Sequence, residues 1–270
     1  MRLGISSWTY AWSVGMAGFP APSAPLDAFG LLAKARELGV GVLQIADNLP
    51  LERLSANELG ALAARARDWG IRLEPGTRGV RPERLLPFLD IAAHLRARLV
   101  RTLLHDDLGC PTLEQAGEFL RALLPELERR DLVLAVENHD FFPTRQLRAL
   151  VEGLHSPRIG VCLDPVNNFA QGESTREVLD NLGVLSVNFH CKDYVIRRKL
   201  GGLGFDVEGA PAGEGMLDLD LCRERLDESM SCIIELWTPW QGSTESTIAL
   251  EADWARRSVH RLNARLGGRP

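Results

Sequence analysis

The chain has 270 residues, of which 45% are hydrophobic and 25% are charged. This composition excludes a disordered or fibrous protein, and the length lies within the range of a single α/β barrel, so a second domain is not required. The 31 basic and 36 acidic residues give a net charge of −5, which argues against nucleic-acid binding through phosphate neutralisation. We therefore expect a small-molecule partner.

The sequence shows no targeting or membrane segment. No apolar run approaches the roughly 18 to 20 residues that span a bilayer, and residues 1–6 turn polar too early for a signal peptide. The five cysteines form no C-x-x-C pair and no disulfide framework, as expected of reduced thiols. These features predict a cytoplasmic protein without membrane contacts.

Short apolar runs alternate with amphipathic stretches from one end of the chain to the other, in eight cycles. Each run is almost uniformly apolar, as a parallel strand covered on both faces should be. The expected strands are residues 3–8, 40–46, 71–74, 99–103, 132–137, 159–164, 185–190 and 232–236.

The stretches between these runs predict helices. Apolar side chains recur every three or four positions, as in residues 59–69, and produce one apolar face. Two helix starts carry a capping box, at Ser55 with Glu58 and at Ser174 with Glu177. Eight strand and helix cycles without a dividing linker favour a single (β/α)8 TIM barrel over residues 1–270, with an open doubly wound sheet as the second choice.

One connection is too long for an ordinary loop. Residues 191–216 follow the seventh expected strand and contain six glycines. A long loop at this position lies at the C-terminal mouth of a barrel, where active sites sit. We expect it to form a mobile wall over that mouth.

Each of the last four expected strands ends in a potential metal ligand: Glu137, Asp164, His190 and Glu235. The intervals are 27, 26 and 45 residues, which match two barrel cycles and one cycle with the long loop. Three carboxylates and one imidazole suit Mn²⁺ or Mg²⁺, with Co²⁺ or Zn²⁺ as further candidates. Acidic residues at strand ends can instead cap a helix or bind an arginine.

The segments that carry these residues resemble the xylose isomerase-like barrel superfamily of sugar isomerases and epimerases. They are Glu-Asn-His-Asp from Glu137, Asp-Pro-Val-Asn from Asp164, His-Cys-Lys-Asp from His190 and Glu-Leu-Trp from Glu235. Residues 3–6 and 212–218 add to the resemblance, which covers essentially the whole chain. It implies that Glu137 and Glu235 form an acid/base pair, whereas Asp164 and His190 serve as ligands only.

The resemblance implies a divalent-metal-dependent sugar or sugar-acid isomerase or epimerase that acts through an enediolate. The alternative is a lyase that decarboxylates a 3-oxo sugar acid, which the supply of cationic side chains favours. An endonuclease-type phosphodiesterase is less favoured, because it needs further metal ligands and a basic surface. Strands three and four offer only Glu74 and His105 for this purpose. A complete ligand set also argues against a non-catalytic sugar-binding barrel.

Four polar residues near the expected mouth are candidates for substrate binding. Arg78 and Arg101 could each hold a carboxylate or phosphate through two hydrogen bonds, although solvated or capping arginines are equally common. His139 could bind substrate or support a ligand, and Lys192 could pair with a substrate anion or form a simple salt bridge. The exposed helices of such a barrel also leave homo-oligomer formation open.

Overall fold

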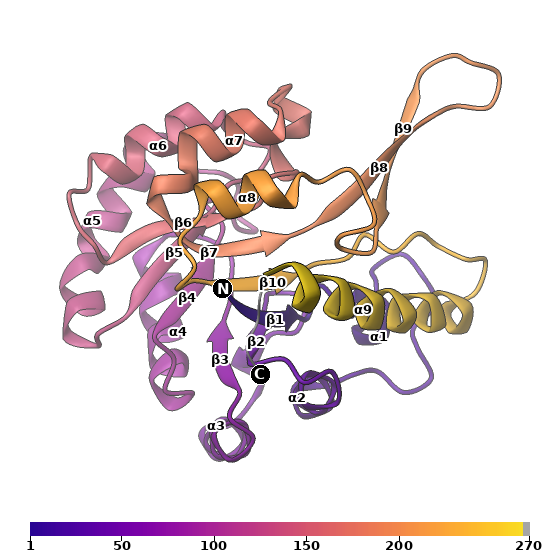
Figure 1. The fold of residues 1–270 in the computed structure, drawn as a ribbon. Coiled ribbons are helices and arrows are strands. Elements are labelled where there is room, and N and C mark those ends of the chain that lie inside the picture. The colour runs from indigo at the N-terminus through magenta and orange to yellow at the C-terminus, as the bar shows by residue number, and fades with distance from the viewer. Residues whose placement is uncertain (267–270) are drawn as a thin grey trace.

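Eight parallel strands curve into a barrel in the computed structural model, which describes residues 1–266 (Figure 1). The strands follow one another in the order β3-β2-β1-β10-β7-β6-β5-β4. Between β3 and β4 the barrel is closed by a parallel bridge of Gly76 with Arg101 and by a 2.9 Å hydrogen bond from Thr77 N–H to the Arg101 carbonyl. The strands are β1 (Arg2–Ser6), β2 (Val42–Ile45), β3 (Arg72–Pro75), β4 (Leu99–Thr102), β5 (Val133–Glu137), β6 (Ile159–Leu163), β7 (Ser186–Cys191) and β10 (Ser231–Ile234).

Helices surround this barrel, as the amphipathic stretches predict. Both expected capping boxes are present, and Thr112 with Gln115 forms a third. The helices are α1 (Ala11–Val14), α2 (Ala28–Glu37), α3 (Ala56–Asp68), α4 (Pro82–His94), α5 (Leu113–Arg129), α6 (Thr144–Glu152), α7 (Thr175–Leu182), α8 (Leu219–Arg225) and α9 (Thr244–Leu266). Short 3₁₀ turns are η1 (Leu51–Arg53), η2 (Asn167–Gln171) and η3 (Gly183–Leu185). The TIM barrel fold is thus confirmed; residues 267–270 of the expected domain lie outside the described residues.

The core lies between the sheet and the helices. Apolar side chains from the outer face of the barrel, such as Leu43 and Phe189, pack with buried helix residues such as Leu62 and Phe88 in one continuous cluster. All five cysteines are free thiols. Within residues 1–266, no helix is both long enough and apolar enough to cross a bilayer.

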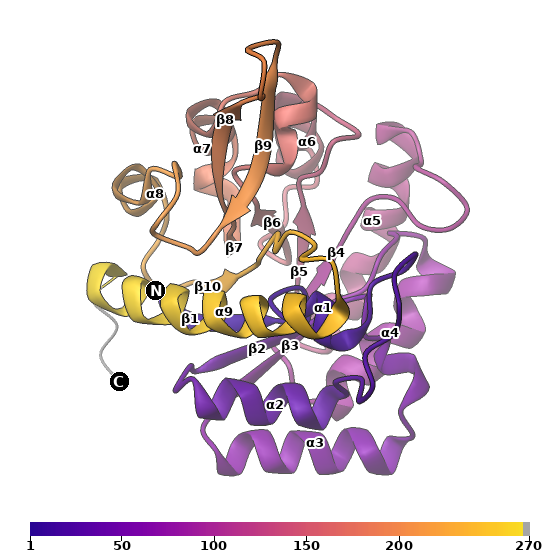
Figure 2. The same cartoon turned by 90° about the vertical axis from the view of Figure 1, so that its right-hand side faces the viewer.

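The long connection after β7 contains a β-hairpin rather than the irregular loop that its glycines suggest. Strands β8 (Asp193–Arg198) and β9 (Phe205–Ala210) pair antiparallel, from Asp193 with Ala210 to Arg198 with Phe205. Figures 1 and 2 show this hairpin projecting from the barrel beside the strand ends. The strand signal was missed because the outer half of the hairpin is exposed and charged, so its apolar pattern is interrupted.

A buried carboxylate anchors the base of this hairpin. Asp193 accepts hydrogen bonds of 2.8 to 2.9 Å from the backbone N–H groups of Tyr194, Gly213, Gly215 and Leu217. A Cβ atom at Gly215 would lie 2.2 Å from Asp193 Oδ1, so glycine permits this approach. The glycine-rich segment 212–218 therefore has a structural role as a cradle for Asp193.

Strand β1 depends on a second close approach, at Gly4. Its neighbours are β2 and β10, and a Cβ atom at Gly4 would lie 2.7 Å from Ile233 Cδ1 and from both Cβ and the carbonyl oxygen of Val42. Such a separation is far below van der Waals contact. The barrel can close at this point only around a residue without a side chain.

We therefore expect Gly4→Ala to lower the free energy of unfolding by about 1–3 kcal/mol, the cost typical of an overpacked core. Gly60→Ala is the matched control, because Gly60 lies exposed in α3 with open space around its Cβ position. Alanine there should stabilise the helix by up to about 1 kcal/mol. Urea denaturation of both variants measures the difference, and equal stability of Gly4→Ala and wild type would contradict the packing argument.

Candidate active site

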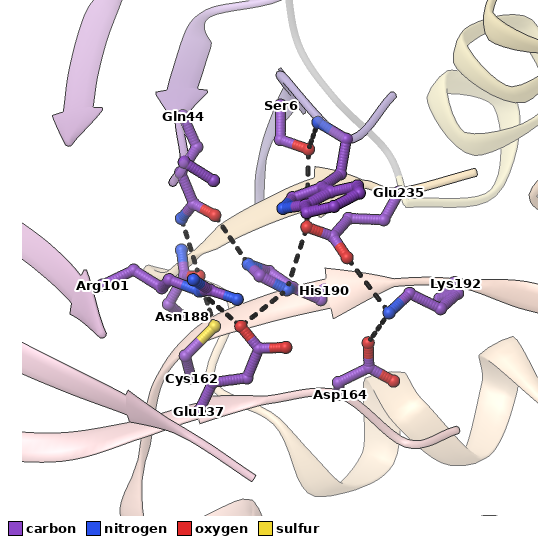
Figure 3. Close-up of polar contacts among 12 residues, drawn as sticks. Ser6, Gln44, Arg101, Glu137, Cys162, Asp164, Asn188, His190, Lys192 and Glu235 are labelled. Carbon is purple, nitrogen blue, oxygen red and sulfur yellow. Dashed lines mark hydrogen bonds and ion pairs between the residues drawn. The ribbon is translucent and has the colours of Figure 1, made fainter. Parts of the chain in front are cut away.

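Four side chains meet at the C-terminal mouth of the barrel (Figure 3). Glu137 ends β5, Asp164 follows β6, His190 lies in β7 and Glu235 follows β10. One ligand atom from each lies within 4.8 Å of the others, and all four residues are buried. The structure thus brings together all four residues that were predicted as metal ligands from their positions at strand ends.

His190 directs one ring nitrogen toward the carboxylates and the other away from them. Its Nδ1 lies 3.5 Å from Glu137 Oε2 and 3.4 Å from Glu235 Oε1, while its Nε2 lies 2.7 Å from Gln44 Oε1. Burial alone would lower the pKa of His190, but the neighbouring Cys162, Glu235 and Glu137 raise it well above its ordinary value. A cation bound here would have to displace the Nδ1 proton.

Glu137 is held at both carboxylate oxygens. Arg101 Nε donates to Oε2, and Asn167 Nδ2 donates to Oε1 at 2.8 Å. Burial opposes ionisation, yet the Arg101 guanidinium, with His190 and Lys192, holds the pKa of Glu137 well below its ordinary value. This glutamate is fixed in place as an anion.

Lys192 lies on the other side of the cluster. Its Nζ is 2.6 Å from Asp164 Oδ2 and 3.1 Å from Glu235 Oε2, and it donates to Asn167 Oδ1 at 3.1 Å. The ammonium also lies 5.2 Å from the centre of the Trp237 ring. Although burial disfavours the charged form, Asp164 and Glu235 raise the pKa of Lys192, so it remains a cation.

A chain of ion pairs connects Glu137 with the rim of the site. Arg101 Nη1 lies 3.0 Å from Asp47 Oδ1, and Arg78 Nε donates to Asp47 Oδ2 at 3.0 Å. The Arg101 side chain is 4% exposed and that of Arg78 is 38% exposed. Both predicted substrate binders line the cavity, and Arg78 presents much the larger exposed surface. Asp47 was not predicted as a residue of the site. It follows β2 by two residues, so its position near a strand end is the signal that could have identified it.

The donor set fits a divalent cation. His190 Nδ1 is buried and has no hydrogen-bond partner among residues 1–266, and Asp164 Oδ2 accepts no hydrogen bond of regular geometry although Lys192 lies beside it. Burial raises the pKa of Asp164 despite that lysine, with Glu137 and Glu235 adding to the effect. Oxygen ligands with one imidazole suit a hard or borderline divalent ion, which would supply the missing positive charge.

A cavity of about 730 Å³ opens above the cluster. Arg78, His105 and His139 contribute polar groups to its wall, and Val207 reaches it from the hairpin. Aromatic side chains form much of the remainder: Trp8, Trp12, Phe169 and Trp237. The space suits a small polar molecule that presents oxygens to the metal ligands and an anionic group to the cationic side chains.

The other predicted residues take different places. His139 is a part-exposed residue of the cavity wall, where its Nδ1 pairs with Asp140. Among residues 1–266, the two groups that could hold a metal ion share Glu137 and His190, and neither includes Glu74 or His105. This arrangement supports one metal centre and gives no support to the multinuclear site of an endonuclease.

Known proteins resemble this chain in sequence and in fold. It matches the xylose isomerase-like TIM barrel family over residues 32–258. It is 37% identical to the 3-oxo-isoapionate decarboxylase of Pectobacterium atrosepticum over 268 residues, which cover 98% of this chain and 96% of that protein.

Solved structures also share the fold. A D-psicose 3-epimerase crystallised in the presence of D-fructose aligns with a TM-score of 0.72 at 18% identity, covering 99% of this chain and 100% of that chain. A xylose isomerase-like TIM barrel protein from Mycobacterium smegmatis in complex with magnesium aligns with a TM-score of 0.65 at 15% identity, covering 97% of each chain.

The geometry predicts that the wild-type protein binds one Mn²⁺ per chain and that Asp164→Ala weakens binding by more than about 100-fold, beyond the loss typical of an outer-shell substitution. Asp140→Ala is the control, because Asp140 lies at the cavity wall outside the cluster. Isothermal titration calorimetry measures both. Unchanged affinity in Asp164→Ala would contradict the four-ligand site.

The raised pKa of His190 predicts a pH dependence for the same binding. Because Nδ1 must lose its proton before it can bind a metal, binding releases a proton and tightens as the pH rises toward the pKa of His190. Calorimetry in two buffers of different ionisation enthalpy counts the released proton. A dissociation constant that does not change with pH would show that His190 is not a ligand.

Proposed function

This chain belongs to the xylose isomerase-like TIM-barrel family, and we propose that it is a divalent-metal-dependent decarboxylase of a 3-oxo sugar acid. The relative that is 37% identical over nearly the whole chain is a decarboxylase of a 3-oxo acid. That similarity favours the lyase alternative over the isomerase or epimerase expected first. The unequal surroundings of Glu137 and Glu235 support the same choice.

Decarboxylation of a 3-oxo acid places defined demands on a site. The bond between the carboxylate carbon and C2 breaks, carbon dioxide leaves, and the bonding electron pair passes to C2 and the 3-oxo oxygen. C2 then takes one proton, so the product is a ketone one carbon shorter. The site must orient the carboxylate, stabilise charge on the 3-oxo oxygen and deliver a single proton.

The two glutamates are unequal in a way that suits delivery of one proton. Both oxygens of Glu137 accept hydrogen bonds, from Arg101 and Asn167, which leaves this carboxylate poorly placed to carry a proton. Glu235 accepts only a long hydrogen bond of 3.5 Å at Oε1, from the Ser6 hydroxyl, and at Oε2 it lies 3.1 Å from the Lys192 ammonium, a group that can supply a proton. An epimerase of the expected type needs two proton-exchanging groups, whereas a decarboxylase needs one. We assign proton delivery to Glu235 together with Lys192.

Glu137, Asp164, His190 and Glu235 would hold the metal ion. When bound, the ion supplies a Lewis acid that stabilises negative charge on substrate oxygens. Mn²⁺ and Mg²⁺ are the candidates that best match three carboxylates and one imidazole, followed by Co²⁺ and Zn²⁺. Arg101 fixes Glu137 and contributes by positioning a ligand.

Arg78 is the residue proposed to bind the substrate carboxylate. Its guanidinium lines the cavity and is held by Asp47, which orients it while leaving part of its side chain exposed. A planar guanidinium can donate two hydrogen bonds to one carboxylate. His139, farther along the wall, is proposed to bind a substrate hydroxyl.

The first test follows carbon and hydrogen. Wild-type protein loaded with Mn²⁺ should release carbon dioxide from a 3-oxo sugar acid in D₂O and place one deuteron on the former C2 of the product, as read by mass spectrometry. Glu235→Gln should lose about 100-fold or more in kcat, the scale of a removed acid or base. Glu214→Gln, on the surface beside Arg257, is the control. Deuterium exchange in ketoses without loss of carbon would instead establish the isomerase.

The second test concerns the carboxylate. Arg78→Met should raise KM by about tenfold or more, as expected for loss of charge-assisted hydrogen bonds. Arg84→Met is a matched control, because the Arg84 side chain is equally exposed at 38% but lies outside the cavity wall. Steady-state kinetics of carbon dioxide release compares the two. An unchanged KM in Arg78→Met would exclude this role.

A further inference from the structure

A buried chain of polar side chains runs through the barrel from His190 toward its opposite end. His190 Nε2 lies 2.7 Å from Gln44 Oε1, and Gln44 Nε2 donates to Asn188 Oδ1 at 3.1 Å. Asn188 Nδ2 then donates to Glu74 Oε2 at 3.0 Å and to Ser231 Oγ at 2.6 Å. All five residues are buried. Apolar side chains usually fill a TIM-barrel interior, so these polar residues call for a physical reason.

The direction of every hydrogen bond in the chain follows from Glu74. Its carboxylate receives donors from Arg72 at 3.1 Å, Ser231 at 3.0 Å and Asn188 at 3.0 Å. Burial raises the pKa of Glu74, but the Arg72 guanidinium and the Ser231 hydroxyl oppose that rise, and we take the ion pair with Arg72 to keep the group an anion, which only accepts. The Ser231 hydroxyl gives its hydrogen to Glu74 and can therefore only accept from Asn188.

The direction of these hydrogen bonds fixes the orientation of the Asn188 side-chain amide and then that of Gln44. Because Asn188 must turn its NH₂ group toward Glu74, its carbonyl oxygen faces Gln44. Cys162, a thiol whose pKa is raised by burial to about 12, donates to the same oxygen at 3.0 Å. Gln44 must then offer its NH₂ to Asn188 and its carbonyl oxygen to His190.

The contact between Gln44 and His190 determines which ring nitrogen of His190 carries no hydrogen. An acceptor at Gln44 Oε1 requires a hydrogen on Nε2, which leaves the lone pair of a neutral imidazole on Nδ1. Nδ1 is the nitrogen that faces Glu137 and Glu235. The hydrogen-bond chain thus presents the nitrogen lone pair to the cluster.

We propose that Glu74 is a positioning residue that sets the tautomer of His190 for metal binding, through Asn188 and Gln44. The inference rests on the metal centre of the proposed function, although the orientation of the two amides can be measured without metal. Partners of this kind fix the tautomer and orientation of metal-binding histidines.

Glu74→Gln is the informative substitution, because Arg72 gives the new amide a preferred orientation. Arg72 only donates, so the introduced amide should turn its oxygen toward Arg72 and its NH₂ toward Asn188. Asn188 and Gln44 would then both reverse, and a donor from Gln44 would face His190 Nε2. The hydrogen of a neutral His190 would move to Nδ1, where it blocks the metal.

Two measurements on the full-length protein test this chain of hydrogen bonds. In metal-free protein, NMR cross-relaxation should place the Asn188 amide protons near the β protons of Ser231 in wild type and near those of Cys162 in Glu74→Gln. Calorimetry with Mn²⁺ should show a dissociation constant about 10- to 100-fold higher in Glu74→Gln. Ser231→Ala is the control for loss of a buried hydrogen bond: it keeps the Glu74 to Asn188 contact, so the amide orientation and the affinity should stay close to wild type.

The outcomes separate this inference from the proposed function. A reversed Asn188 amide with weakened Mn²⁺ binding in Glu74→Gln supports the inference. A reversed amide in a protein whose wild type binds no metal supports the hydrogen-bond chain and contradicts the proposed metal centre. Wild-type Asn188 amide protons next to Cys162 would overturn the inference without any variant, and so would a Glu74→Gln protein with wild-type amide orientation and affinity.

Discussion

The constraint on which this site depends is the balance of charge in a buried volume. Four carboxylates lie within a connected set of contacts, and two fully buried cations, Arg101 and Lys192, face them. Arg78 pairs with the outermost of these carboxylates at the rim, so four negative charges face three positive ones, and the excess that remains raises the pKa of His190; a bound cation would offset it in place of the His190 proton. Uncompensated buried charge is costly, so the cluster favours a bound cation. The carboxylates are Asp47, Glu137, Asp164 and Glu235.

The two buried cations lie on opposite sides of the site, Arg101 beside Glu137 and Lys192 beside Glu235, and give the two sides different chemistry. Arg101 is held by Asp47 and the Thr77 carbonyl, and in this position it fixes Glu137. On the other side, Lys192 contacts Glu235 at the cavity wall, where we propose that a proton is delivered. One glutamate is thereby suited to hold a ligand position and the other to chemistry. This division is an observation that supports the proposed reaction, which consumes one proton.

Much of this architecture could be predicted from the sequence, because each strand is a short apolar run and the ligands stand at strand ends. Glu137, Asp164, His190 and Glu235 are placed by backbone periodicity, which sequence records directly. The hairpin at β8 and β9 was missed because its outer half is exposed and carries no apolar alternation. The roles of Arg101 and of the Gln44 to Glu74 chain were also beyond reach, because they depend on side chains from strands distant in sequence that meet inside the barrel.

The central claim is that the four strand-end residues hold a divalent cation as one unit, with Glu137 kept in place by Arg101. Anomalous diffraction at the manganese edge from crystals soaked in Mn²⁺ tests it most directly. We predict a single strong peak bounded by Glu137, Asp164, His190 Nδ1 and Glu235, with the Arg101 to Glu137 contact intact. A peak that excludes His190, or no peak at this mouth of the barrel, would contradict it.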